Sequence, residues 1–171
     1  MPKKTAPPAD EPHNQFGALC WRAGKAGAEV LLISSRETGR WVIPKGWPMK
    51  GRSGPEAAAI EAWQEAGVKG EIAEAKLGHF TYDKIRRRDT KDQSAQPCIV
   101  DVFPLEVSNI APEFPEQRQR RRKWFAPEAA ARKVAEAELK ALLSGFAPLP
   151  PEASGSNQTR PASRPPKGRK R

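Results

Sequence analysis

Short apolar runs separated by turn-forming residues dominate the first three quarters of the chain. They predict β-strands over residues 16–22, 29–34, 72–82, 97–107 and 123–125. Lys25, Ala26 and Gly27 supply a turn between the first two strands, and a further apolar run over 40–43 ends at Pro44. The pattern therefore predicts several short strands.

Two segments have the signals of helices. In the segment 53–66, Ser53 and Glu56 have the spacing of a capping box, Pro55 suits a first turn, and Gly67 suits the position after the last turn. A second helix is predicted from Pro127 to about residue 146, where apolar residues recur near helical spacing. Several strands with one internal and one terminal helix predict a mixed α/β architecture.

Both ends of the chain are poor in apolar residues and rich in proline. We expect disordered tails over 1–14 and 147–171, which leaves a single domain over 15–146. The net charge is +10, and the C-terminal tail holds six of the basic residues against one glutamate. A basic body with a basic tail suits an anionic partner, and the tail could contact polyanions nonspecifically, although on charge alone a solvated surface explains the excess better.

Composition excludes several classes of protein. The 171 residues contain no apolar run long enough to cross a membrane, and the first residues lack the apolar core of a secretory signal. Cys20 and Cys98 are too few for a disulfide framework or a four-thiolate zinc site, which favours a cytoplasmic protein with reduced thiols. The sequence leaves the oligomeric state open.

On the first predicted helix, Glu61 and Glu65 are candidate ligands for a metal ion. They lie one turn apart and therefore on one face, where their mutual repulsion would be relieved by a divalent cation. An ordinary solvated acidic face explains the same spacing, so the helix alone does not decide between the two.

The segment from Gly46 to Val68, GWPMKGRSGPEAAAIEAWQEAGV, resembles the Nudix box, the signature of the Nudix hydrolases. The family pattern is Gly-x5-Glu-x7-Arg-Glu-U-x-Glu-Glu-x-Gly-U, where U is aliphatic. Here Arg52, Ile60 and Gln64 replace its first glutamate, its arginine and one glutamate of its pair. The segments GRWVIPKG, EAGVKG and RKWF further resemble the branch that hydrolyses diphosphoinositol polyphosphates and diadenosine polyphosphates.

The resemblance implies an α/β/α sandwich with a mixed sheet, a loop–helix–loop and a C-terminal helix. It also implies a pyrophosphohydrolase that uses Mg²⁺ or Mn²⁺ and acts on a small-molecule polyphosphate. Glu61 and Glu65 would be the catalytic residues and metal ligands, joined by the Gly46 carbonyl and the neutral amide of Gln64. The departures from the pattern leave an alternative, a degenerate domain that binds a nucleotide or polyphosphate without efficient hydrolysis.

Basic residues outside the box are candidates for phosphate binding, namely Arg36, Arg40, Lys45, Arg86 and Arg88. A second basic run, formed by Arg118 and residues 120–123, is better interpreted, for most of its members, as a basic approach to a strand end. The general base stays open among Glu61, Asp83 and Glu116.

Overall fold

The structure is a computed structural model that describes residues 12–86 and 94–148. Within these residues, a mixed sheet has the strand order β3-β2-β1-β7-β5, with β4 paired to β1, β6 to β7 and β8 to β2. β1 and β7 pair in parallel, and the other strand pairs are antiparallel. The strands are β1 (His13–Gly24), β2 (Gly27–Ser34), β3 (Trp41–Val42), β4 (Lys45–Gly46), β5 (Val68–Ile72), β6 (Gly78–Arg86), β7 (Ser94–Ile110) and β8 (Arg122–Phe125).

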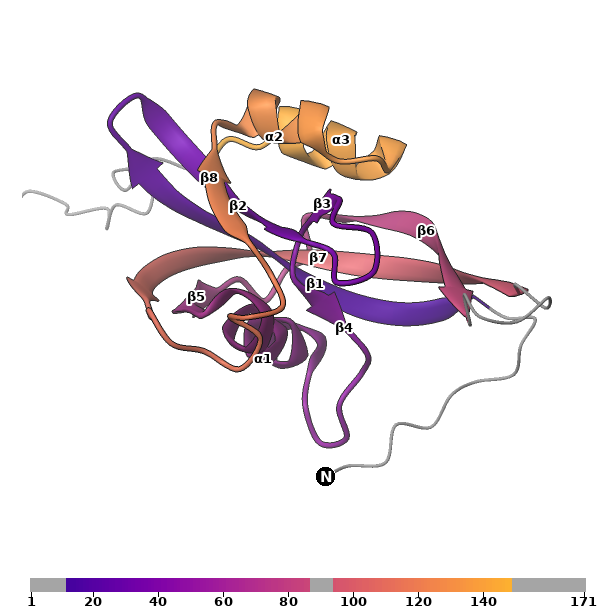
Figure 1. Cartoon of the computed structure of the whole chain (residues 1–171). Coiled ribbons are helices and arrows are strands. Elements are labelled where there is room, and N and C mark those ends of the chain that lie inside the picture. The colour runs from indigo at the N-terminus through magenta and orange to yellow at the C-terminus, as the bar shows by residue number, and fades with distance from the viewer. Residues whose placement is uncertain (1–11, 87–93, 149–171) are drawn as a thin grey trace, which may run out of the picture.

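Helices cover both faces of the sheet (Figure 1). α1 (Gly54–Ala66) packs on one face, where Ala58, Ala62 and Ala66 join an apolar cluster with Leu31 and Leu105. α2 (Pro127–Lys133) and α3 (Ala137–Ser144) pack on the other. Their cluster includes the buried side chains of Leu19, Phe80, Val134, Leu139 and Leu143. The predicted α/β class and mixed sheet are confirmed.

α1 begins and ends as its sequence predicts. The hydroxyl of Ser53 accepts a hydrogen bond from the backbone N–H of Glu56, and the Glu56 carboxylate accepts one from the Ser53 N–H. Gly67 ends the helix with φ 68°, in the left-handed region that glycine tolerates best. These caps fix where α1 starts and stops, and therefore which of its residues face the sheet.

The predicted strand over 72–82 is wrong as a single element. β5 and β6 pair with successive parts of β7, and residues 73–77 leave the sheet between them. The gap lies beside Pro104 of β7, which has no N–H to donate to a neighbouring strand. Lys69, Gly70 and Glu71 of β5 are exposed at the sheet edge, so their segment lacks the apolar alternation of a strand.

Two other predicted boundaries are also corrected. The single C-terminal helix is two helices, because the backbone of Val134 is extended, with ψ 159°, while its side chain is buried in the core. The first strand begins at His13, three residues before its predicted start at Phe16. His13 is buried and pairs with Cys98 of β7, which the polar letters around it do not suggest.

The remaining expectations about the ends of the chain lie mostly outside the described residues. No helix in the described ranges is long and apolar enough to cross a membrane. Cys20 and Cys98 are buried thiols in β1 and β7, at the strand positions that the sequence predicts.

Candidate active site

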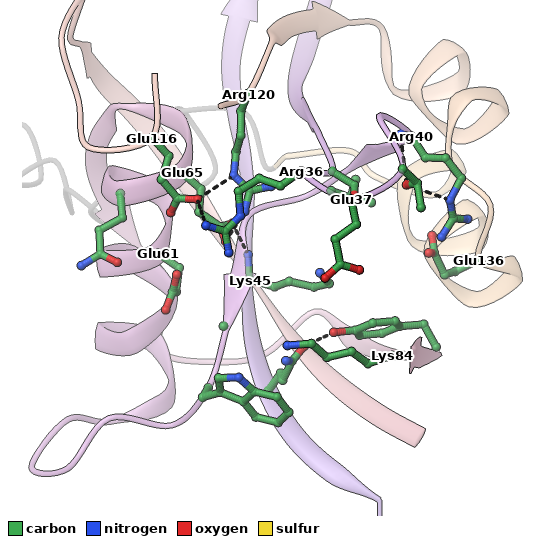
Figure 2. A pocket seen from close by; sticks show the side chains of 18 of the residues that line it. Arg36, Glu37, Arg40, Lys45, Glu61, Glu65, Lys84, Glu116, Arg120 and Glu136 are labelled. Atoms are coloured by element: carbon green, nitrogen blue, oxygen red, sulfur yellow. Dashed lines mark hydrogen bonds and ion pairs between the residues drawn. The ribbon is translucent and has the colours of Figure 1, made fainter. Parts of the chain in front are cut away.

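A polar cavity of about 260 Å³ opens beside α1, β4 and the segment that follows β2 (Figure 2). Nine of the candidate residues named from the sequence line it: Arg36, Arg40, Lys45, Gly46, Glu61, Gln64, Glu65, Asp83 and Glu116. The chain therefore brings the box residues and three of the candidate phosphate-binding residues to one place.

Glu61 and Glu65 enter the cavity from the same face of α1. Only 6% of Glu61 and 8% of Glu65 is exposed, so the face that carries them is buried and not an ordinary solvated surface. The Glu61 carboxylate lies directly against Gly46 of β4, in the space that a Cβ at residue 46 would fill. A glycine at this position is what allows the carboxylate to occupy this place.

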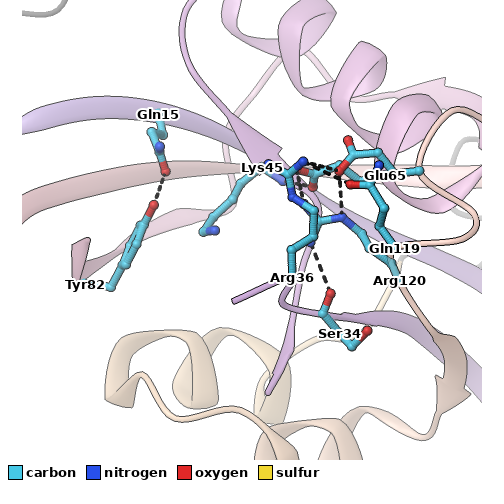
Figure 3. A network of polar contacts seen from close by, with 9 residues as sticks. Gln15, Ser34, Arg36, Lys45, Glu65, Tyr82, Gln119 and Arg120 are labelled. Carbon is cyan, nitrogen blue, oxygen red and sulfur yellow. Dashed lines mark hydrogen bonds and ion pairs between the residues drawn. The ribbon is translucent and has the colours of Figure 1, made fainter. Parts of the chain in front are cut away.

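Both carboxylate oxygens of Glu65 have partners (Figure 3). Its Oε2 accepts a hydrogen bond of 3.0 Å from the backbone N–H of Lys45, and its Oε1 lies 3.0 Å from Nη2 of Arg120. Burial raises the pKa of Glu65, and the charge of Arg120 and the Lys45 N–H oppose that rise. The contacts thus stabilise the ionised carboxylate in a place that would otherwise favour its neutral form.

Lys45 brings a largely desolvated cation to the cavity. Its ammonium lies 4.7 Å from the centre of the Tyr82 ring, and burial lowers its pKa, while the nearby charges of Glu65 and Glu136 oppose that shift. A phosphate in the cavity would meet this cation.

Arg36 and Arg40 lie at the exposed rim. Arg36 donates to the side-chain oxygen of Gln119 at 3.1 Å and pairs with Glu116 at 3.4 Å, and Arg40 donates to the Thr38 hydroxyl. Arg86 is the last residue of β6, and the structure describes its backbone but not its side chain. Arg88 lies outside the described residues, so its predicted contact with substrate stays a prediction.

Arg120 is a site residue that the sequence does not reveal. It is an exception within the basic run, because its side chain is 8% exposed and pairs with both Glu65 and Glu116. The sequence offers no signal for this contact, because Arg120 and Glu65 are 55 residues apart.

Tyr82, Trp47 and Glu136 also line the cavity, although the sequence does not single them out. The Tyr82 hydroxyl donates to Gln15 at 2.7 Å, and burial raises the pKa of Tyr82. Trp47 lies under the Lys84 ammonium, 5.0 Å from ring centre to nitrogen. Glu136 contributes a buried carboxylate oxygen that has no hydrogen-bond partner among the described residues.

Few side chains beside α1 could act as metal ligands. No group of three or more histidine, cysteine, aspartate or glutamate side chains arranged for a metal ion occurs in the described ranges. Gln64 lines the cavity but is exposed, and its amide carries no charge. Mg²⁺ is usually held by one or two carboxylates together with substrate phosphates, so Glu61, Glu65 and the adjoining Gly46 backbone fit that ion without a full protein cage.

Curated relatives include the mitochondrial Nudix hydrolase 12 of Arabidopsis thaliana, 33% identical over 60% of this chain and 50% of its own. Diphosphoinositol polyphosphate phosphohydrolase 3-alpha of Mus musculus is 32% identical over 66% of this chain and 63% of its own. The matches therefore span about half to two thirds of these relatives.

Solved structures share the fold at low identity. A C. elegans Ap4A hydrolase complex aligns with a TM-score of 0.56 and 21% identity, covering 77% of this chain and 93% of that one. The NUDIX domain of Shewanella oneidensis NrtR with ADP ribose aligns with a TM-score of 0.58 and 13% identity, covering 79% and 86%. At such identity these matches show the fold alone.

The family comparison covers most of the molecule. The NUDIX domain model matches residues 11–145, which include the whole sheet, all three described helices and the cavity beside α1. The chain therefore belongs to the Nudix family.

Proposed function

We propose that this protein hydrolyses a pyrophosphate bond in a highly charged nucleoside or inositol polyphosphate, with Mg²⁺ or Mn²⁺ as cofactor. The observation that carries the proposal is the burial of Glu61 and Glu65 on one face of α1, in a cavity that also holds Lys45 and the rim arginines. The two buried carboxylates suit a divalent metal ion, and the basic side chains beside them suit the phosphates of a polyanion bound to that ion.

Glu61, Glu65 and the Gly46 carbonyl would hold the metal ion. When bound, a divalent cation would neutralise phosphate charge and polarise the phosphoryl oxygens. Lys45 would bind a substrate phosphate inside the cavity, and Arg36 and Arg40 would bind more distal phosphates at the rim. Glu61, Asp83 and Glu116 all line the cavity and remain the candidates for accepting a proton from the attacking water.

The relatives support the substrate class. Diphosphoinositol polyphosphates appear in the name of one relative and Ap4A in the name of one structural neighbour. Both compounds contain phosphoanhydride links and several negative charges, which the cations of the cavity could bind. The compartment we propose is the cytoplasm, where the two buried thiols would stay reduced.

A second candidate function is binding without efficient hydrolysis. It is favoured by the engagement of both Glu65 oxygens and by the neutral, exposed Gln64. Such a domain would hold a polyphosphate against Lys45 and the rim arginines but would provide a weak metal site.

A substrate panel separates the two functions. The purified full chain would be incubated with diadenosine tetraphosphate, a diphosphoinositol polyphosphate and ADP-ribose, with Mg²⁺, with Mn²⁺ or with excess EDTA. We expect phosphate or nucleotide release with metal and none with EDTA. Calorimetric binding of a panel compound without turnover in either metal would instead establish the binding function.

A further inference from the structure

Arg120 joins the buried carboxylate of α1 to a distant part of the chain (Figure 3). Its Nη2 lies 3.0 Å from Oε1 of Glu65, and the two side chains are 8% and 10% exposed. A buried ion pair is costly to desolvate and is not by itself evidence of stability. Its place at a candidate metal ligand therefore suggests a role other than stabilising the fold.

The Arg120 guanidinium is held by three acceptors, one on its own segment, one at the end of β2 and one on α1. Its Nε donates to Glu116 at 3.1 Å, its Nη1 to the Ser34 carbonyl at 3.1 Å, and its Nη2 to Glu65. Because the guanidinium is planar, these bonds fix both its position and its plane. The neighbouring N–H of Arg121 also donates to the Ser34 hydroxyl at 2.8 Å, which anchors the segment to the end of β2.

Glu65 is held from the opposite side as well. The Lys45 N–H binds Oε2 while Arg120 binds Oε1, so the carboxylate is clamped between β4 and the segment before β8. A glutamate side chain alone has several rotatable bonds and would otherwise sample many positions. Each oxygen accepts one of these two bonds and keeps a second lone pair for another ligand.

Carboxylates offset the positive charge of Arg120. Glu116 and Glu65 flank it, and Glu116 also pairs with Arg36 at the rim. Glu61 adds a further carboxylate to the same cavity, so Arg120 can orient Glu65 while Glu61 contributes negative charge for a cation. Ile60 stands where the box pattern has its arginine, and its side chain has no hydrogen-bond donor. The guanidinium that contacts Glu65 is instead that of Arg120, on the segment that follows β7.

We propose that Arg120 is a positioning residue that holds the Glu65 carboxylate in the orientation needed to bind a divalent cation. This inference rests on the proposed function, because it assigns Glu65 to a metal site. It adds a residue outside the box, and it gives Glu116 the task of fixing Arg120.

The test measures metal binding by the full chain in the absence of substrate. Arg120→Gln removes the charge, and Arg120→Lys keeps the charge but lacks the planar fork. Arg118→Gln is the matched control, because Arg118 is exposed and is not among the residues lining the cavity. Mn²⁺ affinity would be measured by calorimetry at one pH, with the melting temperature of each variant recorded alongside.

We expect both Arg120 variants to weaken Mn²⁺ binding by about 10–100-fold, as is typical when a residue that orients a metal ligand is lost. The control should stay within about twofold. With substrate, the metal concentration for half-maximal activity should rise in parallel. Glu116→Gln should shift Mn²⁺ affinity in the same direction but less, and it carries the test should Arg120→Gln fail to fold.

The sign of the effect distinguishes positioning from simple charge competition. Tighter Mn²⁺ binding by Arg120→Gln would mean that Arg120 only competes with the metal for Glu65, and would overturn the proposal. An unchanged affinity with a lower melting temperature would assign Arg120 a purely structural role and overturn it too. Failure of the wild-type chain to bind Mn²⁺ at all would refute the metal-dependent function itself.

Discussion

Gly46→Ala tests the contact between β4 and the Glu61 carboxylate. The added Cβ would overlap Oε1 and Cδ of Glu61 and would lie 2.8 Å from its Cγ, whereas ordinary contacts begin near 3.4 Å. The carboxylate must therefore move by about 1 Å, and a displacement of that size can lower a rate by about 100-fold. We expect kcat to fall by about that factor, which corresponds to about 2.7 kcal/mol of transition-state stabilisation.

The assay would compare kcat and the half-maximal Mg²⁺ concentration on the best substrate of the panel. Gly145→Ala is the control, because the φ of −87° at Gly145 suits alanine, its Cβ would make an ordinary contact of 3.4 Å, and it is not among the residues lining the cavity. The same substitution in a Glu61→Gln background should add little further loss, since the displaced carboxylate is already gone. Full activity of Gly46→Ala in the wild-type background would refute the role given to Glu61.

Three further predictions concern α1 and the core. Ser53→Ala removes the cap on the Glu56 N–H and should lower the free energy of unfolding by about 1 kcal/mol in urea titrations, while Ser53→Thr should lose less. Burial raises the pKa of Cys20 from its usual 9.0 to about 12, so the unfolded thiol ionises first and stability should fall as pH rises above 9.0. This fall should be smaller in Cys20→Ala, and an identical pH profile would show that Cys20 is not its source. Gln64→Glu adds a carboxylate at the cavity and should lower the Mg²⁺ concentration for half-maximal activity, and an unchanged titration would place residue 64 outside the metal site.

Local signals in the sequence are enough to predict α1 and most of the sheet. The capping box of Ser53 and Glu56 and the left-handed Gly67 are determined by residues a few positions apart, and the structure has them as predicted. The split between α2 and α3 is not predictable in this way. Val134 fits a helical apolar pattern equally well, yet its backbone is extended and ends α2 while its side chain packs in the core.

The candidate site also contains residues that local sequence predicts and residues that it does not. Glu61, Glu65 and Gly46 could be selected because the box brings them together within one local motif. Arg120 could not, because an arginine in a basic run has the same local pattern whether it is solvated or paired with a buried carboxylate. Tyr82 and Glu136 reach the cavity from β6 and from the start of α3, and their positions depend on how those elements pack.

The most direct test of a metal-dependent pyrophosphohydrolase is the turnover of Glu65→Gln on the best panel substrate at saturating Mg²⁺. This substitution keeps the size of the side chain, replaces one of its two accepting oxygens with an NH2 group, and removes the charge that would hold the cation. We predict a loss of about 10²–10³ in kcat with the fold retained, since electrostatic stabilisation dominates reactions of this kind. Wild-type turnover by this variant, or by the wild-type chain in excess EDTA, would contradict a metal-dependent mechanism through Glu65.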